Sequence, residues 1–525
     1  MNNNSPSKKQ GKKHLSAFDP RTLIFGTLLA ALAAMICMQL IGQVGVTPNT
    51  SLIGALLAMV VARIPGKMMK GYRNLERQNL IQTMTSAGGF SAANCGFIAI
   101  AIVFLFGRSD LIIPMAIGAL IGTVISVIMF GKIFDSKIFP AAGAWPPGVA
   151  TARTLEAGDE GGEKGKRLLQ GLGVGIVGSI FSIPVAAIGI AFIANVFSMT
   201  GLGLGLVIRG YSEQIFGFNL GATRIPQGFM IGAGVVALIQ SLFIIFKKKN
   251  EKSAEAKTHA YTVSDRHAIV ALIVSTGLHI IGALVLALIT GIIAGMSPLA
   301  LIVWVLFAGI ASTITMVLVG TAAMQSGWFP AFAIVTIFLT FGVLLGIEPL
   351  PLAVVVGYLC SVGPCFADMG YDLKTGWILR GKGEDPAYEL DGRKQQVTLE
   401  AFGTIIGIVV VMAFGMLLLG QDIMPPISSV FATAVSAGTD PGIVQTLLLW
   451  AIPGAIIQAA FGTKSVGVLF ATGLLLNNPI YGIGVLVAVV IRLIVGNKFM
   501  EVRDAGLIAG DGLWGFFSNV FRALF

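Results

Sequence analysis

The most constraining feature of the sequence is a very long stretch with almost no charge. Between Ala268 and Ala367 the only Asp, Glu, Lys or Arg residue is Glu348, and of all 525 residues 55% are hydrophobic and 11% are charged. Soluble domains carry about 25% charged residues, and a helix of about 20 apolar residues crosses a bilayer. The chain is therefore predicted to be an all-α polytopic membrane protein, because helices satisfy their backbone hydrogen bonds within lipid.

The basic residues indicate how the chain crosses the membrane. The formal net charge is +10, and Lys and Arg gather between the apolar runs, in Lys8–Lys13, Arg63–Arg77, Lys164–Arg167, Lys247–Lys249 and Arg393–Lys394. Such clusters are typical of cytoplasmic loops. We therefore expect a multi-pass protein of the plasma (cytoplasmic) membrane, with its N-terminus in the cytoplasm, in contact with membrane lipid and with no nucleic-acid partner.

The apolar runs predict about 14–16 transmembrane or re-entrant helices. The expected organisation is a cytoplasmic tail (1–20), a first transmembrane half (21–247), a cytoplasmic linker (248–267) and a second transmembrane half (268–525). Residues 22–62 are expected to form two spans joined by an outer turn at 45–48, residues 168–197 one span, and residues 465–496 two spans broken at 477–479. The segment 82–94 is rich in Ser, Thr, Gly and Asn, which favours close packing or an interrupted helix.

One short pattern occurs twice. Met38-Gln39 precedes Gly45-x-x-Pro48, and Met324-Gln325 precedes Gly327-x-x-Pro330, each between a pair of predicted spans. The charge pattern places the first break outside, and the odd number of predicted spans between the two breaks places the second inside. Opposite orientations are typical of an inverted repeat of two halves, and a chance match is the alternative.

The residue types needed for catalysis do not come together in the sequence. There is no GxxxxGK[ST] motif for phosphate, and His279 is the only histidine within a predicted span. That histidine is either a proton relay or hydrogen-bonded between helices. We therefore expect no enzyme, no cofactor and no metal site. An intramembrane enzyme is a weak alternative.

Broken helices with polar groups at the breaks are typical of secondary transporters. Residues of this kind that could contact a solute are Gln39, Gln43, Thr85, Ser86, Asn94, Gln325, Trp328 and Asn477. Taken singly, each is also explained by hydrogen bonding between packed helices. Asp368 differs, because a carboxylate within a span is expensive and by default functional. We assign it to proton coupling, with a structural ion pair to Lys374 or Arg153 as the alternative.

The residues around Asp368 also carry a family resemblance. Ala367-Asp368, then Asp372-Leu-Lys374-Thr375-Gly376, and then Arg393-Lys-Gln-Gln396 resemble the signature of the oligopeptide transporter superfamily. Further segments that resemble the family's motifs, in the same order, are 45–48, 82–93, 146–152 and 505–510. The resemblance implies proton-coupled uptake of small peptides in one arm of the family, or of chelated metals in the yellow-stripe-like arm. It also makes a homodimer plausible.

The sequence departs from the family's pattern at several positions. It lacks the Asn-Pro-Gly and Lys-Ile-Pro-Pro-Arg motifs of the peptide arm, so it is more similar to the yellow-stripe-like arm and its bacterial relatives. Pro147, Val149 and Met369 stand where the family usually has other residues, so no ligand is carried over. The function expected is a proton-coupled secondary transporter of small peptides or of peptide-like or metal-chelate solutes. A passive channel is the alternative.

Overall fold

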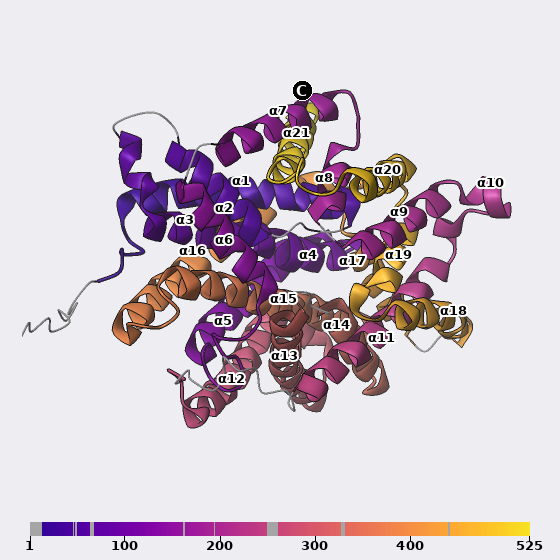
Figure 1. Cartoon of the computed structure of the whole chain (residues 1–525). Coiled ribbons are helices and arrows are strands. Elements are labelled where there is room, and N and C mark those ends of the chain that lie inside the picture. Colours follow the sequence, from indigo (N-terminus) through magenta and orange to yellow (C-terminus); the bar gives the residue numbers. More distant parts are fainter. Residues whose placement is uncertain are drawn as a thin grey trace, which may run out of the picture.

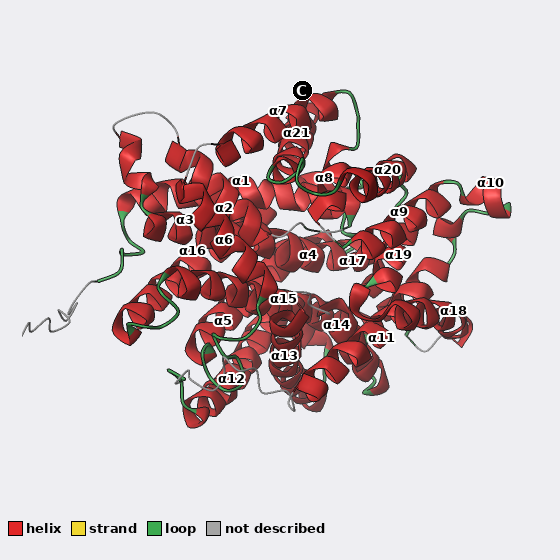
Figure 2. Cartoon of the chain, in the orientation of Figure 1, coloured by secondary structure: helices red, strands yellow, loops and turns green. Residues whose placement is uncertain are grey.

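The computed structural model describes residues 13–45, 47, 50–63, 68–160, 163–193, 195–248, 261–326, 331–438 and 441–524. Within these ranges every regular element is a helix (Figures 1 and 2), which confirms the all-α prediction. The α-helices are α1 (Pro20–Val44), α2 (Thr50–Arg63), α3 (Leu75–Phe90), α4 (Ile98–Leu105), α5 (Ile112–Ile133), α6 (Pro146–Glu160), α7 (Glu163–Ile180), α8 (Val185–Ile193), α9 (Val196–Gly210), α10 (Ser212–Phe216), α11 (Ile225–Lys248), α12 (Asp265–Ile289), α13 (Pro298–Ser326), α14 (Ala331–Leu344), α15 (Pro349–Leu379), α16 (Pro386–Leu419), α17 (Pro426–Ala437), α18 (Pro441–Phe461), α19 (Val466–Leu475), α20 (Pro479–Val495) and α21 (Arg503–Leu524).

The helices fall into two classes by length. Eight segments in the described part of the chain are long and apolar enough to cross a membrane, and eight shorter apolar stretches of 10–17 residues accompany them, one of which lies within the 24-residue helix α11. The protein is therefore a multi-pass membrane protein, and several of its apolar helices, among them α2, α17 and α19, are too short to cross a membrane. Half-length helices are viable at membrane depth only where neighbouring helices or a cavity cover their ends.

Three of the expected full spans are wrong. α2 has 14 residues, too few to cross a hydrocarbon core of about 30 Å. The expected span 168–197 is broken between α7 and α8, where Ser182 adopts a φ of 57° and Pro184 follows. Proline cannot continue a helix interior because it lacks the N–H donor. The third is the first of the two spans expected in 465–496, because α19 has only 10 residues. The break between them at residues 477–479 is confirmed, since α19 ends at Leu475 and α20 begins at Pro479.

The predicted interruption in the third span is also confirmed. A π-helix, η2 (Ser91–Phe97), joins α3 to α4, and such bulges are frequent at functional sites. Close packing accompanies it, because a Cβ on Gly88 would lie 2.7 Å from the carbonyl oxygen of Ala30 on α1. Glycine at this position lets the two helix backbones approach each other.

Helices from both halves of the sequence are interleaved in space. α21 packs against α7 and α8, and α18 packs against α11. In Figure 1 the yellow C-terminal helices accordingly lie among the magenta helices of the first half. These helices form one group, and α1–α6 with α12–α16 form a second group. The division into halves at residues 248–267 and the inverted repeat both stay predictions, and residues 249–260 of the linker lie outside the described residues.

α15 is the central helix of the second group. It has 31 residues, nearly all buried, and it packs against α3, α5, α6, α13, α14 and α16. Pro349 starts it at the position where a missing N–H has no consequence. His279 of α12 lies 2.8 Å from the hydroxyl of Tyr358 on α15, which confirms that this histidine is hydrogen-bonded between helices.

Candidate functional site

Three buried carboxyl groups meet where α15 and α16 pack together. Asp368 and Asp372 are four residues apart and so share one face of α15, and Glu400 projects from α16. The three residues are 2%, 0% and 1% exposed, and one carboxyl oxygen of each lies within 4.8 Å of the others. We call these three residues the carboxylate cluster.

Hydroxyl and amide groups from α2 and α3 donate to the cluster. Ser86 Oγ lies 3.2 Å from Asp368 Oδ2, and Thr50 Oγ1 lies 3.4 Å from Asp368 Oδ1. Ser51 Oγ and Gln82 Nε2 each donate to Asp372 Oδ1 at 2.7 Å. Thr50 and Ser51 form the first turn of α2, so the half-length helix begins at the cluster with its positive dipole end toward the carboxyl groups.

No basic side chain in the described part of the chain neutralises the cluster. Among the described residues no Lys, Arg or His forms an ion pair with Asp368, Asp372 or Glu400. Asp372 Oδ2 and Glu400 Oε2 are buried without any hydrogen-bond donor. Two unit charges 4.8 Å apart repel by about 3.5 kcal/mol at an effective dielectric constant of about 20. The cluster therefore needs protons or a bound cation to neutralise it, and an all-oxygen donor set suits either a proton or a hard cation.

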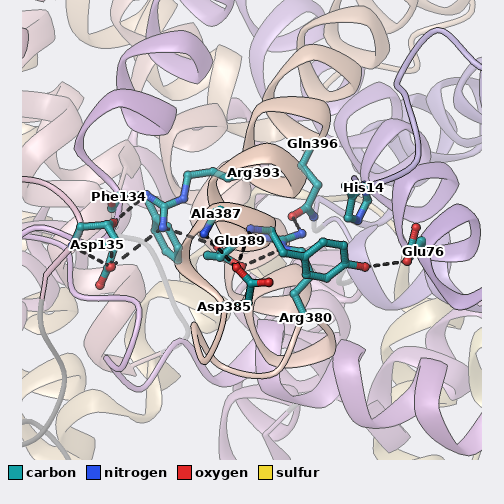
Figure 3. Close-up of polar contacts among 12 residues, drawn as sticks. His14, Glu76, Phe134, Asp135, Arg380, Asp385, Ala387, Glu389, Arg393 and Gln396 are labelled. Atoms are coloured by element: carbon teal, nitrogen blue, oxygen red, sulfur yellow. Dashed lines mark hydrogen bonds and ion pairs between the residues drawn. The ribbon is translucent and has the colours of Figure 1, made fainter. Parts of the chain in front are cut away.

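A contrasting, neutralised network lies beside the cluster. Figure 3 shows Glu389 between the guanidinium groups of Arg380, at 2.7 Å, and Arg393, at 3.4 Å. Arg380 also donates to Gln396 Oε1 at 2.6 Å, and Gln396 Nε2 donates to the main-chain oxygen of Asp372 at 2.9 Å. The network thus holds the backbone of α15 next to the cluster while its own charges are paired.

The signature residues after Asp372 position α15. Lys374 Nζ donates to the main-chain oxygens of Ala141 and Gly143, at 2.8 and 3.0 Å, and Thr375 Oγ1 donates to the main-chain oxygen of Gly148 at 3.0 Å. A side chain on Gly376 would collide with Gln396 and Arg380. No ion pair joins Asp368 to Lys374 or Arg153 in the described residues, so that alternative is wrong.

The other residues named from the sequence have different surroundings. Ser86 is part of the site, but Gln39, Gln43, Asn94 and Asn477 make no hydrogen bond to the three carboxyl groups. Gln39 is fully buried with both amide atoms unpartnered, Asn94 Nδ2 donates to Thr47 Oγ1 at 2.9 Å, and Asn477 is exposed. Trp328 and the side chain of Gln325 lie outside the described residues.

Glu400 is the important residue that the sequence reasoning missed. It is the only charged residue between Lys394 and Asp422, so the rule that singled out Asp368, a lone carboxylate within an apolar span, also applies to it. The donors Thr50, Ser51 and Gln82 had no comparable signal, because polar residues of these types are common where helices pack.

Comparison with known families gives one match. The family model described as OPT oligopeptide transporter protein matches residues 18–246 and 234–522, which together span nearly the whole chain. A search of curated proteins found no match.

Proposed function

The chain belongs to the OPT oligopeptide transporter family, and from that premise we propose that it is a secondary active transporter driven by protons. Membership makes it a transporter of oligopeptides or related solutes. The proposal adds that the carboxylate cluster takes up the coupling protons. The observation that carries it is the presence of three buried carboxyl groups within 4.8 Å of one another without a basic partner.

The physical argument rests on the charge of the cluster. When the cluster is protonated, it is close to neutral and its hydroxyl and amide neighbours pack around it at little electrostatic cost. When protons leave, the carboxylates repel one another, and they then need additional hydrogen-bond donors and water to stabilise their charge. This favours a conformation in which the start of α2 rearranges and the cluster becomes hydrated. Differential stabilisation of two conformations by proton binding is what coupling requires.

The proposed solute is a small peptide or a peptide-like or metal-chelate compound. The absent Asn-Pro-Gly and Lys-Ile-Pro-Pro-Arg motifs favour the yellow-stripe-like arm. A metal in such a chelate would be cargo. The basic clusters support a plasma-membrane location with a cytoplasmic N-terminus, and a homodimer remains part of the proposal on the family resemblance alone.

The test is a current measurement on purified protein in liposomes, with a panel of di- to pentapeptides and metal chelates. We expect solute-dependent currents that require a proton gradient and persist when Na⁺ is replaced by choline. Currents that instead follow a Na⁺ gradient would reassign the cluster to a cation. Failure of vesicles to accumulate solute by counterflow would favour the passive channel.

Substitution of the cluster tests the residues. Asp368→Asn, Asp372→Asn and Glu400→Gln should each reduce proton-driven current at least tenfold, while solute counterflow at symmetric pH is retained, because each change removes an ionisable group and preserves side-chain size. Glu384→Gln is the matched control, since Glu384 is exposed in the loop between α15 and α16. Wild-type currents and pH dependence in all three cluster variants would end the proposal.

A further inference from the structure

A separate cavity of about 390 Å³ lies among the ends of five helices. Its lining comes from α4, α9, α11, α17 and α19 and from the segment before α11, and includes Arg209, Arg224, Gln227, Ser429, Thr433 and Ser436. We call it the arginine cavity. It shares no lining residue with the carboxylate cluster.

Two guanidinium groups line this cavity without a carboxylate partner. Arg209 Nη1 donates to Asn219 Oδ1 at 2.9 Å, while its Nε is buried and has no acceptor. Arg224 Nη1 lies 3.4 Å from the hydroxyl oxygen of Thr433. Glu213 acts on Arg209 electrostatically, but neither arginine forms an ion pair with a described residue. Donor capacity is therefore left for an anion.

The position of Arg209 depends on the absence of a side chain opposite it. A Cβ on Gly221 would overlap Arg209 Nη2, so even alanine at this position must displace the guanidinium group. Because Gly221 has no side chain, the Arg209 guanidinium group can lie in the wall of the cavity.

An acceptor lies beside these donors. Gln227, in the first turn of α11, is 8% exposed, and its Oε1 has no hydrogen-bond partner although it lines the cavity. A buried, unsatisfied amide oxygen is costly and needs an N–H group. The 24-residue helix α11 also starts here, and its N-terminal dipole favours negative charge.

We propose that the arginine cavity binds a solute carboxylate that has an N–H group close by, as at the C-terminal end of a peptide or of an amino-acid-derived chelator. The two arginines would hold the carboxylate, which guanidinium groups match in geometry, and Gln227 Oε1 would accept the N–H. The inference places the cavity on the outer side of the membrane and rests there on the proposed function, because α11 runs from the cavity to its last residue, Lys248, at the predicted cytoplasmic side. Lys and Arg are usually enriched on the cytoplasmic side of the membrane, so this bias does not account for two arginines on the outer side.

The test compares binding of trialanine with that of trialanine amide to the full-length protein in nanodiscs, by titration calorimetry without any gradient. The free acid should bind at least about tenfold more tightly, because the amide cannot form the charge-assisted hydrogen bonds that a carboxylate forms with guanidinium groups. Arg209→Gln combined with Arg224→Gln should abolish this preference, and Gly221→Ala should reduce it. Arg108→Gln, in an exposed pair with Asp110 outside the cavity, should leave it unchanged.

Unfolding temperatures confirm that each variant is folded. Equal binding of acid and amide by the wild type, binding of neither, or a preference that survives loss of both arginines would overturn the inference. Failure of the proposed function would give a different result, because peptide binding in this assay does not depend on proton coupling and would persist. Glu400→Gln should keep the preference for the acid even where proton-driven current is lost.

Discussion

At the scale of single residues, this protein treats its buried charges in two opposite ways. The carboxylate cluster is left without cations, whereas Glu389 is paired with Arg380 and Arg393, all three residues being at most 6% exposed. Glu389→Gln should destabilise the protein by about 3–5 kcal/mol, because it leaves the buried guanidinium group of Arg380 without its carboxylate and leaves Arg393 with only the longer contact to Asp135, at 3.9 Å. Unfolding midpoints in detergent measure this. Asp110→Asn breaks an exposed pair with Arg108 and should change stability by no more than about 1 kcal/mol. Equal effects of the two substitutions would contradict the assignment.

At the scale of elements, the segment before α1 is fastened to the ends of α3 and α16. Its backbone N–H groups donate to side chains of both helices, in the pairs His14–Asp391, Leu15–Glu76 and Ala17–Gln395. Figure 3 shows His14 and Glu76 in this region, and the hydroxyl of Tyr388 donates to Glu76 Oε1 at 2.6 Å. A short segment held by three such bonds is a local unit that can detach while the helices stay folded.

Detachment of this segment should depend on pH. Burial lowers the pKa of His14, and nearby Arg380 lowers it further, against the opposing effects of Glu76 and Asp391. The detached segment therefore binds a proton more readily, with a pKa near 6.5. Attachment is fully favourable above that pH and weakens as the pH falls through it. Hydrogen exchange at residues 14–17, corrected for intrinsic rates, should be faster at pH 5.5 than at pH 8. In His14→Gln this difference should disappear, and its persistence there would assign the effect to other groups.

At the scale of the whole molecule, the interleaving of helices makes the two halves of the sequence depend on each other. α21 covers α7 and α8, and α18 covers α11, so each half alone would leave apolar faces without their helix partners. If the chain is divided within the polar linker, between residues 254 and 255, the two fragments should copurify when expressed together and neither should give a monodisperse product alone. Affinity copurification followed by size-exclusion chromatography measures this. A stable separate half would show that the interleaved contacts are dispensable.

The family signature shows how much of the site could be predicted. Asp368 and Asp372 could be found because a carboxylate in an apolar run is energetically costly in the bilayer. Ser86 could be found because it lies in a segment unusually rich in small polar residues. Lys374 could not be assigned correctly in the same way. Its charge suggested a partner for Asp368, but its Nζ reaches the main-chain oxygens of Ala141 and Gly143 instead.

By itself, the sequence determined the all-α class, the membrane location and most of the helix breaks, because partitioning into lipid and the effects of Pro and Gly depend on residues close together in the chain. Only the tertiary structure decided that the first residue of α2, Thr50, contacts Asp368, that Glu400 completes the carboxylate cluster, and that Arg209 and Arg224 line one cavity. Those facts depend on which helix faces meet. In lipid, where most faces are similarly apolar, close packing and a few polar contacts determine that choice, and both arise between residues far apart in the sequence.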